Sequence, residues 1–255
     1  MLDDDVFTQG GFRCRLQWGR RGAREAAARG DIVVIVDVLR FSSAVATAVS
    51  RGGEIYPCAY AADVENLART VDAQIAARGE GSSESPFSLS PRSYALLQPG
   101  TRVVLPSPNG AQCTLNASAA PYVFAGAIVN GDAVARVLEP LLTNSDAALT
   151  VIACGERWTT PSEDGDLRFA IEDLLGAGAI LSGLSRHSQS PEARVAAGAF
   201  TRNRDDVREM LQDCASGREL RARGLDADVH DCAQVDSIDA VPVLCGAAYA
   251  AFAPG

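Results

Sequence analysis

The sequence contains no lysine, because all 23 of its basic residues are arginine. Without lysine the chain lacks the Gly-Lys-Ser/Thr phosphate loop, a Schiff-base lysine and the lysine of protein kinases. Any bound anion must therefore be held by arginine, by backbone N–H groups or by a metal ion. Histidine is scarce too: His187 and His230 are too few for a three-histidine zinc site and stand in no metalloprotease pattern, which disfavours a zinc hydrolase.

Cysteine pairs and long apolar runs are also missing. The seven cysteines are widely spaced and form no Cys-x-x-Cys pair, so neither a disulfide framework nor a zinc knuckle is expected. No stretch of about 18 apolar residues could span a bilayer, and residues 1–10 carry three aspartates where a signal peptide has its apolar core. We therefore expect a protein of the reducing cytoplasm that is not bound to a membrane.

Positive charge is in deficit, which bears on the kind of partner. The net charge is −9, and only 6% of residues are aromatic, so the chain offers neither a basic stripe nor a stacking platform for nucleic acid. With 255 residues, 47% of them hydrophobic, the composition is that of a globular protein. A small-molecule partner is favoured, and a homo-oligomer is left open.

Short apolar runs alternate with longer Ala- and Leu-rich segments, as in α/β domains whose strands are followed by covering helices. The run 32–36 is apolar at every position, which predicts a strand buried on both faces in a parallel sheet. The sequence thus predicts a three-layer α/β/α fold with a largely parallel or mixed central sheet, in a single domain over residues 1–255. The Ser- and Gly-rich segment 79–91 is expected to be a mobile surface loop. Strands are predicted over 12–17, 32–37, 54–58, 102–106, 122–125, 148–153 and 241–245, and helices over 21–29, 42–51, 62–78, 109–118, 130–142, 167–185, 191–200, 204–216 and 216–223.

The segment 37–43 follows the buried strand and opens the next predicted helix. In open α/β sheets ligands bind beyond the carboxyl ends of strands, where helix N-termini offer N–H groups and a positive dipole. Asp37 is therefore a candidate metal ligand or nucleophile, and Arg40 a candidate clamp for a phosphate or carboxylate. Ser42 and Ser43 are candidate donors to phosphate oxygens. The alternative is an N-capping serine and an ordinary aspartate at a strand end.

A second strand end carries the segment 106–110, Pro-Ser-Pro-Asn-Gly. Its prolines fix the backbone, while Asn109 and Gly110 tolerate turn conformations that aim successive N–H groups at one anion. A plain turn accounts for the same pattern.

A third strand end carries Cys154, Glu156 and Arg157. The adjacent Glu and Arg are either a solvated ion pair or a site that binds a metal and an anion together. No histidine is near Cys154 in sequence to lower its pKa, which favours a buried structural thiol over a nucleophile.

The pair Glu172-Asp173 lies in an apolar, helix-like segment whose small residues 176–178 predict close packing of the helix on the sheet. Two adjacent carboxylates are costly to bury without a counter-charge, so a divalent cation or an arginine partner is expected, unless the helix turns one of them toward water. Farther on, the acidic segment 226–236 reads as a mostly exposed connection, with Asp228 and Asp236 as lesser metal candidates.

Together these segments resemble the 2-phosphosulfolactate phosphatase family, the ComB-like family known from coenzyme M biosynthesis. The resemblance implies a single α/β/α domain and a magnesium-dependent phosphatase that converts 2-phosphosulfolactate and water to 3-sulfolactate and phosphate. Phe41 stands where the family commonly has a small residue, and the loop 87–91 is shorter and less acidic than usual, so a different substrate remains an alternative. The motifs, in order, are Val-Asp-Val-Leu-Arg (36–40), Ser-Pro-Asn-Gly (107–110), Ala-Cys-Gly-Glu-Arg (153–157), Glu-Asp-Leu-Leu-Gly-Ala-Gly (172–178), Asp-Cys-Ala-Gln-Val-Asp (231–236) and Val-Pro-Val (241–243).

With this resemblance, the residues predict a site for Mg²⁺ and a small anionic phosphorylated substrate. Mg²⁺ takes few oxygen ligands from protein, so Asp37 with Glu172 or Asp173 is expected to bind it while phosphate and water complete the octahedron. Asp37 either attacks phosphorus or positions the attacking water.

The cationic and backbone groups complete the predicted site. Arg40 and Arg157 are expected to neutralise charge on the transferring phosphoryl group, and the backbone around Asn109 and Gly110 to hold remaining oxygens. Two other functions stay open: a phospho-ligand binding protein that has lost turnover, and a phosphotransferase with an acceptor other than water.

Overall fold

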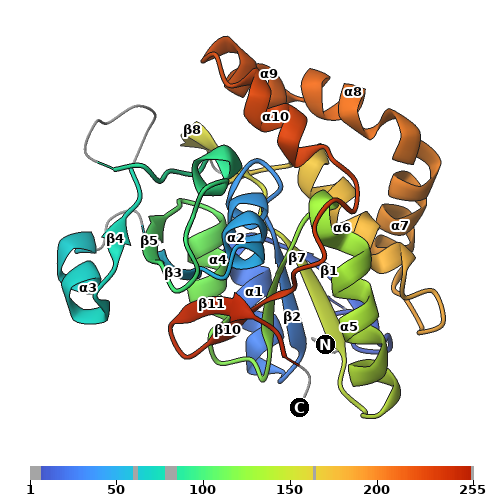
Figure 1. The fold of residues 1–255 in the computed structure, drawn as a ribbon. Coiled ribbons are helices and arrows are strands. Elements are labelled where there is room, and N and C mark those ends of the chain that lie inside the picture. The colour runs from blue at the N-terminus through green and yellow to red at the C-terminus, as the bar shows by residue number, and fades with distance from the viewer. Residues whose placement is uncertain (1–6, 60–62, 78–84, 163–164, 254–255) are drawn as a thin grey trace.

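The computed structural model describes residues 7–59, 63–77, 85–162 and 165–253. Its middle layer is a nine-stranded mixed sheet in the order β1-β7-β2-β6-β10-β11-β3-β5-β4 (Figure 1). Two parallel groups are joined by the C-terminal hairpin β10–β11, which pairs antiparallel with β6 on one side and β3 on the other. The strands are β1 (Cys14–Trp18), β2 (Ile32–Val36), β3 (Glu54–Cys58), β4 (Gln74–Ile75), β5 (Arg102–Pro106), β6 (Val123–Gly126), β7 (Leu149–Ala153), β10 (Pro242–Cys245) and β11 (Ala248–Ala251).

Strand β2 shows why the sheet lies between two helical layers. All five of its residues are buried, because Val33 and Ile35 pack on one face and Ile32, Val34 and Val36 on the other. The first face is covered by α1 (Gly19–Ala28), α2 (Phe41–Ser50) and α4 (Gly110–Ala117), and the second by α5 (Gly131–Thr143), α6 (Ile171–Ser182) and α7 (Pro191–Asn203). The predicted three-layer α/β/α fold is confirmed.

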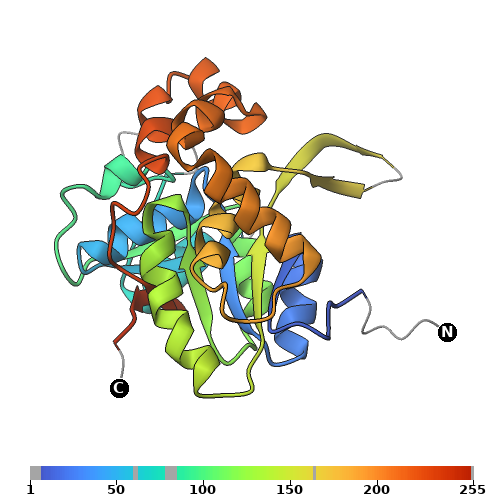
Figure 2. The same ribbon diagram turned by 90° about the vertical axis from the view of Figure 1, so that its right-hand side faces the viewer.

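Two further units lie at one end of the sheet. The short helices α8 (Val207–Asp213), α9 (Ala215–Ala222) and α10 (Asp226–Cys232) form a cap, drawn in orange and red at the top of Figure 1. A hairpin of β8 (Glu156–Ser162) and β9 (Gly165–Arg168) projects from the body as an arm (Figure 2).

Several predicted boundaries are wrong. The helix predicted over 167–185 begins only at Ile171, because residues 165–168 pair as β9. The helix predicted over 62–78 is the shorter α3 (Val64–Val71), which ends at Asp72 in a left-handed conformation before β4; positions 62 and 78 lie outside the described residues. Residues 204–216 divide into a 3-10 turn, α8 and the start of α9 at a break around Cys214.

Of the segment predicted to be a mobile loop, positions 79–84 lie outside the described residues, and its mobility stays a prediction. All seven cysteines are free thiols, which confirms that no disulfide framework holds the fold. Within the described ranges, no helix has both the length and the apolar character needed to cross a membrane.

Candidate active site

Asp37, directly after β2, is held by two backbone donors. Its carboxylate oxygens accept the N–H groups of Phe41 at 3.2 Å and Gly110 at 2.8 Å. The side chain is buried, and this burial raises the pKa of Asp37 to about 6, with a further rise from Glu172 that is opposed by the two N–H donors and Arg40. The predicted anchor at the end of β2 is therefore a fixed carboxylate that carries most of its negative charge at neutral pH.

The turn before α4 brings a second strand end to Asp37. A Cβ atom on Gly110 would lie 2.2 Å from Cδ1 of Phe41 and 2.8 Å from Oδ2 of Asp37, so only glycine fits there. Asn109 donates its side-chain N–H to Glu156 at 2.9 Å, while its Oδ1 atom is buried with no hydrogen-bond partner in the described part of the chain. Because the Gly110 N–H donates to Asp37, it is not available to a ligand. The group of this turn that a ligand can still use is the side-chain Oδ1 atom of Asn109.

Glu156, at the start of β8, is a further member of the site, and the sequence offered it with Arg157 as either a solvated ion pair or a site for a metal and an anion. Burial above all, together with Asp37 and Glu172, raises the pKa of Glu156 to about 7, against the opposing effects of Asn109 and Arg168. The signal was the Glu-Arg pair at a strand end. In the described residues Glu156 and Arg157 have different partners, because Glu156 bonds Asn109, whereas Arg157 bonds Asp166 across the hairpin at 3.2 Å.

Both acidic residues in the first turn of α6 are buried, Glu172 to 2% exposure and Asp173 to 4%, so neither faces water. Asp173 accepts the N–H of Val38 at 2.8 Å and of Gly155 at 2.9 Å, and thereby ties the ends of β2 and β7 together. Burial, Asp37 and Glu172 raise the pKa of Asp173 well above its ordinary value. As expected from the sequence, the first turn of α6 buries two acidic groups that a nearby positive charge would stabilise.

The small residues of α6 allow this helix to lie close to the end of β2 and to α7. A Cβ atom on Gly176 would lie 2.5 Å from Val38 and 2.8 Å from Val36, so this residue packs against the end of β2 as predicted. Gly178 instead faces α7, where a Cβ atom would lie 2.1 Å from the carbonyl oxygen of Ala196.

Arg40 is buried and forms an ion pair with Asp228 of α10. Asp228, which is 2% exposed, also accepts the hydroxyl of Ser90 at 2.5 Å. The expectation of a mostly exposed connection over 226–236 is wrong, because residues 226–232 form α10, which turns Asp228 inward, and of the whole segment only Asp226 is exposed. Asp228 therefore serves as the partner of Arg40, and the partly buried Asp236 pairs with Arg204 at 2.7 Å.

The remaining predicted residues lie beside the site. The hydroxyl of Ser42 donates to the Ile35 carbonyl at 2.9 Å and that of Ser43 to the Val38 carbonyl at 2.8 Å, so both are engaged with backbone. Arg157 is paired with Asp166, while its Nε and Nη2 atoms are buried without a partner among the described residues. Their roles toward substrate stay predictions. Cys154 is fully buried with its pKa raised well above the ordinary value, which confirms an inert thiol.

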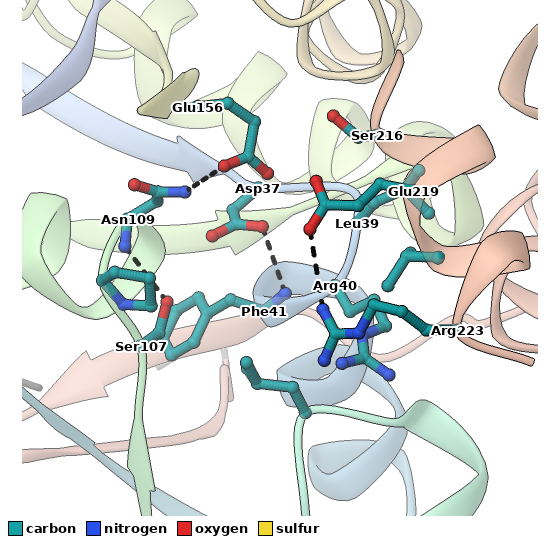
Figure 3. Close-up of a pocket in the computed structure, with 13 residues that line it drawn as sticks. Asp37, Leu39, Arg40, Phe41, Ser107, Asn109, Glu156, Ser216, Glu219 and Arg223 are labelled. Carbon is teal, nitrogen blue, oxygen red and sulfur yellow. Dashed lines mark hydrogen bonds and ion pairs between the residues drawn. The ribbon is translucent and has the colours of Figure 1, made fainter. Parts of the chain in front are cut away.

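A cavity of about 190 Å³ opens between these residues (Figure 3). It is smaller than the roughly 300–1,000 Å³ of pockets for drug-sized ligands, so it suits a small metabolite. The carboxylates of Asp37 and Glu156 and the guanidinium of Arg40 reach it together, which allows a cation and an anion to bind side by side. The lining residues are Asp37, Leu39, Arg40, Phe41, Leu89, Ser107, Pro108, Asn109, Glu156, Ser216, Glu219, Leu220 and Arg223.

The donors at the cavity are those of a hard cation. Carboxylate and amide oxygens are the protein ligands that Mg²⁺ takes, usually one or two carboxylates beside water and substrate phosphate. Asp37, Glu156 and the unpaired Oδ1 of Asn109 supply such oxygens. Among the described residues, no three acidic, histidine or cysteine side chains converge to enclose a metal by themselves, so phosphate and water would have to supply the rest.

Comparison with known proteins places residues 21–247 within the family model described as 2-phosphosulpholactate phosphatase. A protein of Carboxydothermus hydrogenoformans named "Probable 2-phosphosulfolactate phosphatase" is 32% identical over 220 residues, covering 84% of this chain and 87% of the relative. Proteins of the same name from Thermus thermophilus (32% over 232 residues; 87% and 91% covered) and Gloeobacter violaceus (30% over 225 residues; 83% and 87% covered) are similar over nearly the same span.

Proposed function

The chain belongs to the 2-phosphosulfolactate phosphatase family, and from this premise we propose that it hydrolyses 2-phosphosulfolactate in the cavity beside Asp37. It is thus a phosphoric monoester hydrolase, which releases inorganic phosphate and leaves the 2-hydroxy acid. The free thiols of all seven cysteines suit a reducing cytoplasm as its compartment.

The observation that carries the proposal is the gathering of acidic groups beside Arg40. Asp37, Glu156 and Asp173 come from three separate segments. Burial raises the pKa of each, and Asp37 raises the pKa of both Glu156 and Asp173 further. Such repulsion is costly in the free protein, and it falls when positive charge enters. A phosphate ester that arrives with a divalent cation supplies that charge and finds Arg40 for its own oxygens.

We assign the cation as Mg²⁺, with Asp37 and Glu156 as the carboxylates that would hold it and Asn109 as an amide ligand. When bound, it would neutralise charge on the phosphoryl group and orient the ester. Glu172 and Asp173, expected as ligands from the sequence, would instead add negative charge from behind Asp37, because neither lines the cavity, whereas Asp37 does.

The residues of the chain then have distinct tasks. Arg40, fixed by Asp228, offers its guanidinium to phosphoryl oxygens, which gain charge as the ester bond breaks. Glu156, fixed by the hydrogen bond from Asn109, would hold the cation as a carboxylate, and the departing 2-hydroxyl oxygen would take its proton from water. With a pKa of about 6, Asp37 is mostly ionised and either attacks phosphorus or orients water for that attack.

Phosphate release from 2-phosphosulfolactate, measured with Mg²⁺ and with EDTA, tests the proposal. We expect release with Mg²⁺, its loss in EDTA and recovery on re-addition of Mg²⁺. No release under any condition would refute the function, and full release in EDTA would refute the metal assignment. Acid quenching of a reaction with ³²P-labelled substrate separates the two roles of Asp37, since only direct attack leaves label on the protein.

A further inference from the structure

The cavity has a second wall, which comes from the cap and not from the sheet. Ser216, Glu219, Leu220 and Arg223 line it, at spacings of three and four residues along α9 and its C-cap. Residues so spaced share one face of a helix. Figure 3 shows Ser216, Glu219 and Arg223 across the cavity from Asn109 and Ser107. Any ligand bound at Asp37 is therefore also in reach of α9.

The hydroxyl of Ser216 makes no hydrogen bond within the described residues. Ser216 is 4% exposed, and its Oγ atom is buried with no hydrogen-bond partner in the described ranges. A buried hydroxyl without a partner costs free energy, and serines in helices usually avoid this cost by bonding to nearby backbone. A ligand oxygen in the cavity would supply the missing partner.

The packing of α9 keeps Ser216 at this position. A Cβ atom on the neighbouring Gly217 would lie 1.8 Å from the carbonyl oxygen of Leu211, so α9 and α8 are in direct contact. The Cys214 thiol accepts the N–H of Gly217 at 3.3 Å and also contacts Glu172 of α6, which joins the first turn of α9 to the sheet side of the site. These contacts of Cys214 and Gly217 fix the start of α9 and with it the position of Ser216.

The two walls differ in charge. Asp37, Glu156 and Asn109 make the sheet wall acidic and rich in oxygen, which suits the cation and the phosphoryl group. The α9 wall carries the half-exposed Arg223, whose contact with the exposed Glu219 is 3.6 Å long and of the solvent-screened kind that contributes little. An anionic group that projects from the substrate away from its phosphate meets a hydroxyl and a guanidinium on this wall.

We propose that Ser216 and Arg223 bind the acid group of the substrate that is not transferred. The Ser216 hydroxyl donates to an oxygen of this group, and Arg223 balances its charge. This inference rests on the proposed function, and it makes α9 the element that selects acidic phosphate esters over neutral ones. The acid group is a carboxylate or a sulfonate, which share the chemistry that this wall offers.

The test compares three esters that differ only in acid groups: 2-phosphosulfolactate, with a carboxylate and a sulfonate, 2-phospholactate, with a carboxylate alone, and isopropyl phosphate, with neither. In Ser216→Ala we expect kcat/KM to fall about tenfold or more for the acidic esters, mainly through KM, and to stay unchanged for isopropyl phosphate. A fall for both acidic esters identifies the carboxylate, and a fall for 2-phosphosulfolactate alone identifies the sulfonate.

Arg223→Gln should show the same selectivity, and Arg218→Gln is its matched control, because Arg218 lies on α9 but outside the cavity. Ser216→Ala should melt no lower than the wild type, since the hydroxyl has no partner to lose. Equal loss on all three esters, or loss on none, would overturn the inference while leaving the proposed function intact. A wild type that hydrolyses none of the esters would overturn both.

Discussion

Replacing Glu156 by glutamine is expected to make the protein more stable and less active. Glutamine keeps an oxygen that can accept the hydrogen bond from Asn109, which is 2.9 Å long, and it removes the charge. In the folded chain the pKa of Glu156 rises from 4.5 to about 7. Each pKa unit corresponds to about 1.4 kcal/mol, so above pH 7 the ionised group costs the fold about 3 kcal/mol.

The direction of the pH dependence follows from the raised pKa. Between pH 4.5 and about 7 the folded chain keeps this proton while the unfolded chain has lost it, so wild-type stability falls as the pH rises through that window. Glu156→Gln has no such proton. Its advantage over the wild type is therefore small at pH 5 and reaches about 3 kcal/mol at pH 8.

Urea unfolding at pH 5 and pH 8, with EDTA present to exclude cations, measures this difference. Glu209→Gln, at an exposed position on α8, is the control and should stay within about 0.5 kcal/mol of the wild type at both pH values. A Glu156→Gln protein that is no more stable than the wild type at pH 8, or equally shifted at both pH values, would refute the reasoning.

Other substitutions test the supports of the site. Asp228→Asn removes the carboxylate that pairs with the buried Arg40 and should lower the free energy of unfolding by about 3–5 kcal/mol in urea titrations. Ser90→Ala, which removes one hydrogen bond to Asp228, should cost about 2 kcal/mol, and equal losses in the two variants would contradict the ion-pair account. Gly110→Ala would place a methyl group 2.2 Å from Phe41 and displace Asp37, so phosphate release should fall by about 10²-fold. The control is Gly198→Ala, which should keep full activity because nothing lies within 4 Å of the added methyl group. Similar activity of the two variants would argue against the assignment of Asp37 to the active site.

The middle of the fold and the positions of the acidic groups followed from local patterns. The uniformly apolar run of β2 required two covering layers, and Asp37 at its end marked the edge where the site lies. The buried pair Glu172-Asp173 stood out because carboxylates are rare in an apolar helix.

Features that depend on distant contacts were not predictable in this way. Residues 158–160 of β8 are exposed and the strand sequence shows no apolar alternation, so the arm and the inward position of Glu156 left no periodic signal. Asp228 is buried only because Arg40, 188 positions away, receives it. Ser216 lines the cavity because α9 folds back over the sheet, which no local pattern encodes.

The central claim is that Asp37 carries the hydrolysis in the cavity between the sheet edge and the cap. Its most direct test is the turnover of Asp37→Asn on 2-phosphosulfolactate at saturating Mg²⁺, beside a circular-dichroism check that the variant is folded. We predict a loss of at least about 10² to 10³ in kcat. A folded variant that releases phosphate at the wild-type rate would contradict the account.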